Sequence, residues 1–122
     1  MNAAVRFYEL AVQCKGRIRS GGWWSPWYVR RLRDDTAELF RLFQALPEPR
    51  LPCVDRLIRL VLQALGSELC GFRCRKERIA SLFFALHNLP RAYLPGDHPM
   101  CISEKNAIAY SLEWLEKASM PS

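Results

Sequence analysis

Apolar residues recur at helical spacing along almost the whole chain. The first stripe combines positions three and four apart with flanking apolar residues: Val5, Tyr8 and Val12, widened by Phe7, Leu10, Ala11 and Cys14. This pattern predicts an amphipathic helix from Asn2 to about Lys15. We expect Gly16, and then Ser20-Gly21-Gly22, to end it.

The second predicted helix has a strong start signal. Ser25 can accept a hydrogen bond from an unpaired backbone N–H, and Pro26 at the first helical position gives up no helical hydrogen bond. Trp24 and Val29 stand at the positions of a hydrophobic staple. The inward positions recur every three or four residues: Leu32, Thr36, Leu39, Phe43 and Leu46, widened by Val29 and Phe40. They predict the longest helix of the chain.

Three further helices complete the pattern. From about Cys53 to Leu65 the chain is apolar nearly all round, which predicts a central helix that touches several others and ends at Gly66. A fourth helix is expected from about Arg75 to Leu86, with inward residues Ile79, Leu82, Phe83 and Leu86. Ser103 caps a last helix to about Ala118, with an apolar face of Ile108, Leu112 and Leu115 beside Trp114. We therefore predict one all-α domain over residues 1–122, a compact bundle of about five unequal helices.

Charge is distributed unevenly. The formal net charge is +6, and residues 1–33 carry all of this excess. Their basic side chains are Arg6, Lys15, Arg17, Arg19, Arg30, Arg31 and Arg33, against the single acidic Glu9. Such a region attracts an acidic protein face, nucleic acid or an anionic membrane, although a solvated helix face has the same composition. Arg30 with Asp34, and Arg31 with Asp35, are four residues apart and would partly neutralise each other.

Aromatic residues are interleaved with these cations. Trp, Tyr and Arg are enriched in protein interfaces, so we predict a partner-binding surface. Its candidate residues are Arg17, Arg19, Trp23, Trp24, Trp27, Tyr28, Arg30, Arg31 and Arg33. Trp27 and Tyr28 begin a helix with an apolar inward face, so we expect them in the core. Trp23 or Trp24 is then the tryptophan expected to touch a partner.

These features favour a non-enzymatic protein-interaction module of the inhibitor, immunity or adaptor type, with a partner that is acidic. The same residues could instead anchor a homodimer. The alternative function is nucleic-acid binding, with Lys15, Arg17 and Arg19 in a glycine-containing connector contacting phosphates. A second basic group, Arg73, Arg75, Lys76 and Arg78, could extend that surface.

Metal and catalytic motifs are incomplete. Cys70, Cys74 and His87 match three ligands of a zinc-finger spacing, but positions 91–93 offer no fourth. His98 and Cys101 could complete the set only if their loop folded back. The sequence also has no phosphate-binding glycine loop, G-x-S-x-G elbow or H-E-x-x-H motif. We therefore expect no metal, no cofactor and no enzymatic activity.

The cysteines and the longest apolar stretch bear on location. Five cysteines are an odd number, and each is expected to act as a small buried hydrophobe in a reducing, cytoplasmic setting. The longest apolar stretch, Leu57 to Leu65, carries Arg59 and Gln63 and is less than half a bilayer span. We expect no transmembrane helix.

Overall fold

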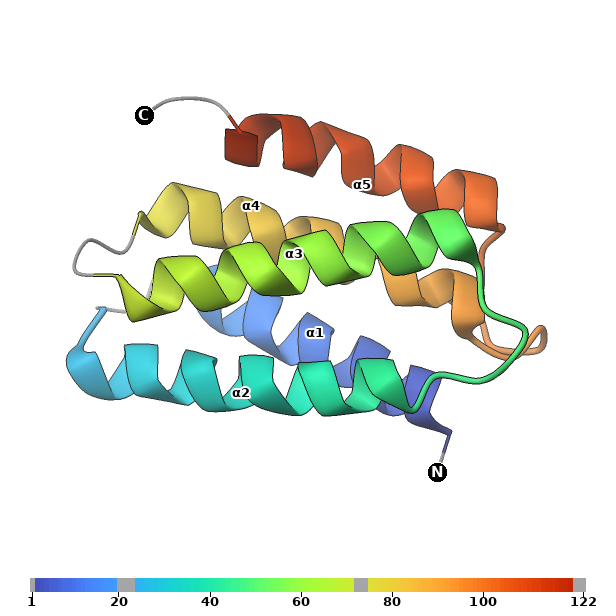
Figure 1. Ribbon diagram of the computed structural model, residues 1–122, viewed down its shortest axis with the longest axis horizontal. Helices are drawn as coiled ribbons and strands as arrows, with labels where there is room; N and C mark the ends of the chain where they lie inside the picture. Colours follow the sequence, from blue (N-terminus) through green and yellow to red (C-terminus); the bar gives the residue numbers. More distant parts are fainter. Residues whose placement is uncertain (1, 20–23, 72–74, 120–122) are drawn as a thin grey trace.

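The computed structural model describes residues 2–19, 24–71 and 75–119. These ranges hold five α-helices and one 3-10 helix: α1 (Ala3–Arg19), α2 (Pro26–Gln44), α3 (Pro52–Cys70), α4 (Lys76–Leu86), η1 (Leu89–Tyr93) and α5 (Glu104–Ser119) (Figure 1). No strand occurs within them, so the prediction of an all-α bundle is confirmed. In the same ranges, no helix combines the length and apolar character that a membrane crossing requires.

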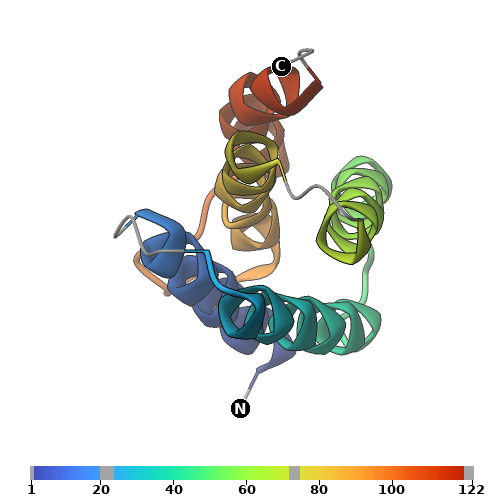
Figure 2. The same ribbon diagram turned by 90° about the vertical axis from the view of Figure 1, so that its left-hand side faces the viewer.

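The helices surround one hydrophobic core. Viewed end-on, α4 lies between α1, α3 and α5, and α2 runs beside α1 and α3 (Figure 2). The largest fully buried side chains come from α1 to α4 and η1, and they include Phe7, Leu39, Ile58 and Phe83, whereas α5 buries only the small Ala107, Ser111 and Ala118. α3 contacts α2, α4, η1 and α5, as its apolar sequence predicted, but it lies to one side of α4 and leaves Leu60 exposed.

α2 follows its sequence signals closely. The backbone N–H of Tyr28 donates to the Ser25 hydroxyl oxygen at 3.1 Å, so the predicted cap is present. All five predicted inward residues, Leu32, Thr36, Leu39, Phe43 and Leu46, are buried. The Thr36 hydroxyl donates to the Leu32 carbonyl oxygen at 2.8 Å, which allows this polar side chain to lie in the core.

Two predicted helix ends are wrong. α1 continues through Gly16 to Arg19, and α3 continues through Gly66 to Cys70. A glycine inside a helix costs about 1 kcal/mol relative to alanine, whereas burial of a leucine side chain contributes about 1.5–3 kcal/mol. Leu69 is fully buried beyond Gly66, and Ile18 packs on the core beyond Gly16. Tertiary packing thus carries both helices past their glycines.

The predicted inward face of α5 is also wrong in part. The buried residues are Ala107, Ser111 and Ala118, while Leu112 is exposed. The reason is close packing of α5 on α4, in which the ring of Trp114 stacks on that of Phe84 with 4.5 Å between centroids. This contact sets the rotation of α5 and directs Leu112 outward.

The cysteines have different environments. Cys14 is buried and Cys101 is half-buried, but Cys53 and Cys70 are exposed, which contradicts the expectation for these two. Both lie in the terminal turns of α3, away from its inward positions. Cys74 lies outside the described residues. Burial, helped by the carboxylate of Asp35, raises the pKa of the Cys14 thiol to about 12, so this thiol stays protonated and unreactive.

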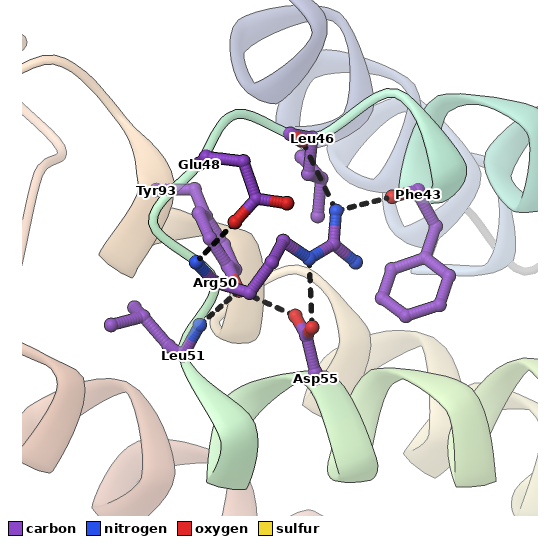
Figure 3. A network of polar contacts seen from close by, with 7 residues as sticks. All are labelled: Phe43, Leu46, Glu48, Arg50, Leu51, Asp55 and Tyr93. Carbon is purple, nitrogen blue, oxygen red and sulfur yellow. Dashed lines mark hydrogen bonds and ion pairs between the residues drawn. The ribbon is translucent and has the colours of Figure 1, made fainter.

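Arg50 closes the corner between α2 and α3 (Figure 3). One of its terminal nitrogens donates to the carbonyl oxygens of Phe43 and Leu46, at 3.1 Å each, where α2 ends. Its Nε donates to the carboxylate of Asp55 in the first turn of α3 at 2.7 Å. A single side chain therefore satisfies carbonyl groups at the end of one helix and ties them to the start of the next.

Tyr93 joins η1 to the same corner. Its hydroxyl donates to the second carboxylate oxygen of Asp55 and accepts a hydrogen bond from the backbone N–H of Leu51 at 2.7 Å (Figure 3). Burial and the bond to Asp55 raise the pKa of Tyr93 to about 12. The hydroxyl thus stays neutral, and α2, α3 and η1 are held together at this end.

Candidate functional site

A cavity of about 350 Å³ lies at the opposite end of the bundle, where α2 begins. We call it the basic pocket. Its lining comprises Trp24, Ser25, Pro26, Val29, Arg30, Arg33 and Lys76. Three of these side chains are cationic, and none of the described residues that line the pocket carries a carboxylate. The pocket is therefore suited to an anionic group beside an apolar one.

The three cations come from two helices. Arg30 and Arg33 lie about one turn apart on α2, and Lys76 is the first residue of α4, which starts at the same end of the bundle (Figure 1). The Lys76 ammonium nitrogen lies 5.7 Å from the centroid of the Trp24 ring. The Nε of Arg33 donates to the carbonyl oxygen of Leu69 on α3 at 2.7 Å, which anchors that side chain. The first turns of α2 and α4 add the positive ends of two helix dipoles.

The tryptophans differ from expectation. Trp27, predicted to be in the core, is 69% exposed. It precedes the buried Leu32 by five residues, which places it about 140° away around the helix. Trp24 is half-buried and packs on the ring of Tyr28 with 5.2 Å between centroids. Both side chains are partly buried and pack against the hydrophobic core. Trp23 lies outside the described residues.

Arg17 is separated from the pocket. It lies within α1 rather than in a connector, and its guanidinium forms an ion pair with Asp35 at 2.6 Å in which both side chains are mostly buried. Asp35 therefore pairs with Arg17 and not with Arg31, four residues before it. Arg30 and Asp34 form no ion pair in the described structure either. For Asp35, the ion pair with Arg17 of α1 thus forms in place of the expected pair with Arg31 of the same helix.

The remaining candidates are spread out. Arg31 is exposed on α2, and Arg19 ends α1, although its side chain lies outside the described part of the chain. Lys76 belongs to the second basic group of the sequence but was not among the nine predicted site residues. Lys76 comes near Trp24 only because α3 runs back along the bundle, so that α4 starts at the same end as α2, and no local pattern indicates this.

The potential metal ligands do not converge. Within the described residues, no group of three histidine, cysteine or acidic side chains could hold a metal ion. Cys70 ends α3 at one end of the bundle, whereas His87 follows α4 at the other (Figure 1). His87 is half-buried, and its Nδ1 lies 2.6 Å from the carbonyl oxygen of Phe84. Burial, and then the nearby charge of Lys15, lower the pKa of His87 to about 4, so the ring is neutral near pH 7.

We group five side chains near the start of α2 as the end surface: Trp24, Arg30, Arg33 and Lys76 from the basic pocket, and Trp27. Trp27 is not in the lining, but it follows Pro26 of the lining and lies one helical turn before Arg30. The end surface offers an exposed indole and a cationic pocket. This combination can bury an apolar side chain and pair a carboxylate on the same ligand. Comparisons of the chain with protein-family models, with curated proteins and with solved structures found no match.

Proposed function

We propose that this chain is a non-enzymatic protein-interaction module, of the inhibitor, immunity or adaptor type, which binds an acidic segment of a partner at the end surface. The observation that carries the proposal is the exposed Trp27, one helical turn before Arg30 of a pocket that has three cations and no carboxylate among its described residues. This is the composition of an interface centre without its partner.

The energetics favour a protein ligand that covers Trp27. An aromatic side chain of this size buries about 150–250 Å², so covering its exposed fraction contributes roughly 3–4 kcal/mol. Arg30, Arg33 and Lys76 add a positive field that accelerates association with an acidic partner and rejects a basic one. Affinity then comes mainly from the indole, and specificity from the cations.

Nucleic acid is a weaker candidate because fewer of the predicted contacts are present. Arg17 is held in an ion pair with Asp35, which reduces its capacity to bind phosphate. The ring of Trp24 already contacts the ring of Tyr28 and the Lys76 ammonium group, which reduces its capacity to stack on a base. Only Trp27 offers an exposed indole to a base among the described tryptophans.

The proposal can be tested by panning a random-peptide display library against the immobilised full chain. Enriched peptides are labelled and titrated, with fluorescence anisotropy as the readout, against wild type, Trp27→Ala and Arg30→Glu. We expect enrichment of Asp and Glu, and affinity at least ~10-fold lower for both variants, as for residues that dominate an interface. The matched controls are Tyr110→Ala on α5 and Arg56→Glu in the first half of α3, both exposed residues distant from the end surface, which should change affinity less than ~2-fold.

Three results would count against the proposal. The first is enrichment of no acidic peptides, and the second is equal binding by the two variants and their controls. The third is tight binding of single-stranded DNA at about 50 mM salt that collapses at about 200 mM and weakens in Arg30→Glu, which would support the nucleic-acid function instead.

A further inference from the structure

We propose that an open groove between α2 and α3 accepts the apolar face of an amphipathic helix from the partner, while acidic side chains of that helix pair with Arg33 and Arg41. We call it the α2–α3 groove. The inference rests on the proposed function and specifies the partner's chemistry: a helix with apolar residues on one face and carboxylates on its flanks.

The groove is large and apolar. It has a volume of about 510 Å³, within the range of sites that hold a ligand. Its floor is formed by the buried Leu62 and Leu69 of α3, and its wall by the half-buried Phe40 and the exposed Ala37 of α2. A third helix laid between two neighbours buries its own apolar ridge in this kind of depression.

Gly66 deepens the groove at a cost to α3. It lies within the helix and lines the groove, and a Cβ added there would meet no atom within 4 Å. Alanine would therefore fit, and it is the better helix former. The fold does not need the empty space at this position, whereas a side chain entering from outside can use it.

The rim of the groove is positively charged. Arg33 and Arg41 are both in its lining and lie eight residues apart on α2, about 12 Å along the axis. No described residue of the lining is acidic. Arg41 is paired with Glu38 but is 75% exposed, so an incoming carboxylate can exchange for that partner at little cost. Carboxylates seven or eight residues apart on a helix parallel or antiparallel to α2 match this separation.

The α2–α3 groove and the basic pocket are adjacent. Arg33 lines both the α2–α3 groove and the basic pocket, so it marks the point where the two meet. A helix lying along the groove toward the start of α2 would reach Trp24 and Lys76. One acidic amphipathic segment can thus occupy both depressions, which a short extended peptide confined to the end surface cannot.

The test uses a display library of helical peptides of roughly 16 residues, about 24 Å long, with leucine fixed along one face and the other positions random. It is panned against the full chain, and enriched peptides are titrated against wild type, Gly66→Leu and the matched control Gly16→Leu. Gly16 is also a helical glycine with open space beside it, but it lies on α1, outside the groove. We expect Asp or Glu pairs seven or eight residues apart, and affinity at least ~10-fold lower in Gly66→Leu only. Circular dichroism confirms that both variants are folded.

Each other outcome overturns the inference in a recognisable way. If acidic peptides lose affinity in Arg30→Glu but not in Gly66→Leu, the groove is not used and the proposed function stands. If Gly66-dependent peptides carry no acidic preference, the chemistry assigned to the partner is wrong. If wild type sediments as a dimer and Gly66→Leu as a monomer, the groove holds a second copy of this chain. If no peptide shows dependence on Gly66, the groove binds no helix.

Discussion

The two ends of the bundle contain the same kinds of side chain and use them differently. At the end where α2 is joined to α3, Arg50 lies 5.0 Å from the ring centroid of Phe43 and 5.7 Å from that of Tyr93. At the opposite end, Lys76 lies 5.7 Å from the ring centroid of Trp24. Cations beside aromatic rings therefore do not by themselves distinguish a structural corner from a binding surface.

The difference lies in the acceptors. Arg50 has two carbonyl oxygens and the Asp55 carboxylate within its own fold, and Tyr93 uses its hydroxyl both as donor and as acceptor (Figure 3). The described lining of the basic pocket offers its three cations no carboxylate. One end completes its electrostatics internally, and the other is suited to an anion from outside.

The largest effect is expected from Asp55→Ala at the joined end. The substitution removes the acceptor of both Arg50 and Tyr93 in a mostly buried site, so the free energy of unfolding should fall by about 3 kcal/mol. Urea denaturation measures it, with the exposed Asp97→Ala at the same end as control, expected within ~0.5 kcal/mol of wild type. A loss below about 1 kcal/mol for Asp55→Ala would mean that packing alone holds the corner.

A smaller effect concerns His87, which also lies at the joined end. Its pKa is about 4 in the fold and 6.5 in an ordinary setting, so between these values the unfolded chain binds a proton that the native chain does not. The free energy of unfolding is therefore highest with respect to this group above pH 6.5, and it decreases as the pH falls from 6.5 toward 4. With allowance for the partial exposure of His87, we expect a decrease of about 1–2 kcal/mol. The measurement is the free energy of unfolding of wild type and of His87→Gln across this pH range. The same pH dependence in both proteins would refute the lowered pKa of His87.

The smallest effect is a gain in stability at Gly66 in the α2–α3 groove. Gly66→Ala should raise the free energy of unfolding by about 0.5–1 kcal/mol, because alanine is the better helix former and its Cβ meets no neighbour. Thermal or urea unfolding measures it, and Gly16→Ala on α1 is the matched comparison with the same expected sign. A lower free energy of unfolding in Gly66→Ala would show that a side chain at position 66 does not fit in the groove.

Local signals in the sequence were reliable where one helix alone decides the outcome. The Ser25-Pro26 start and the buried positions of α2 are both present, because a cap and a 3.6-residue period need no knowledge of the rest of the chain. The same period places Trp27 on the outward side, so its exposure could have been predicted from its spacing to Leu32. The expectation that Trp27 lies in the core was therefore wrong, although the sequence contained the signal for its exposure.

Features that depend on two distant segments could not be predicted. Arg17 and Asp35 are 18 residues apart, and their pairing depends on how α1 packs against α2. Likewise, Lys76 reaches the basic pocket only because α4 begins at the same end of the bundle as α2. Helical continuation past Gly16 and Gly66 follows from burial of residues beyond them, which the local sequence does not encode.

The bond between the Leu51 amide and the Tyr93 hydroxyl also affects the order of events during synthesis. The two residues are 42 positions apart, so the α2–α3 corner lacks one of its acceptors when α3 itself is made. At about 5–20 residues per second, the ribosome adds Tyr93 roughly 2–8 s after Leu51. Until then the backbone N–H of Leu51 lacks this acceptor, and of the bonds described at the corner only those between Arg50 and Phe43, Leu46 and Asp55 can form.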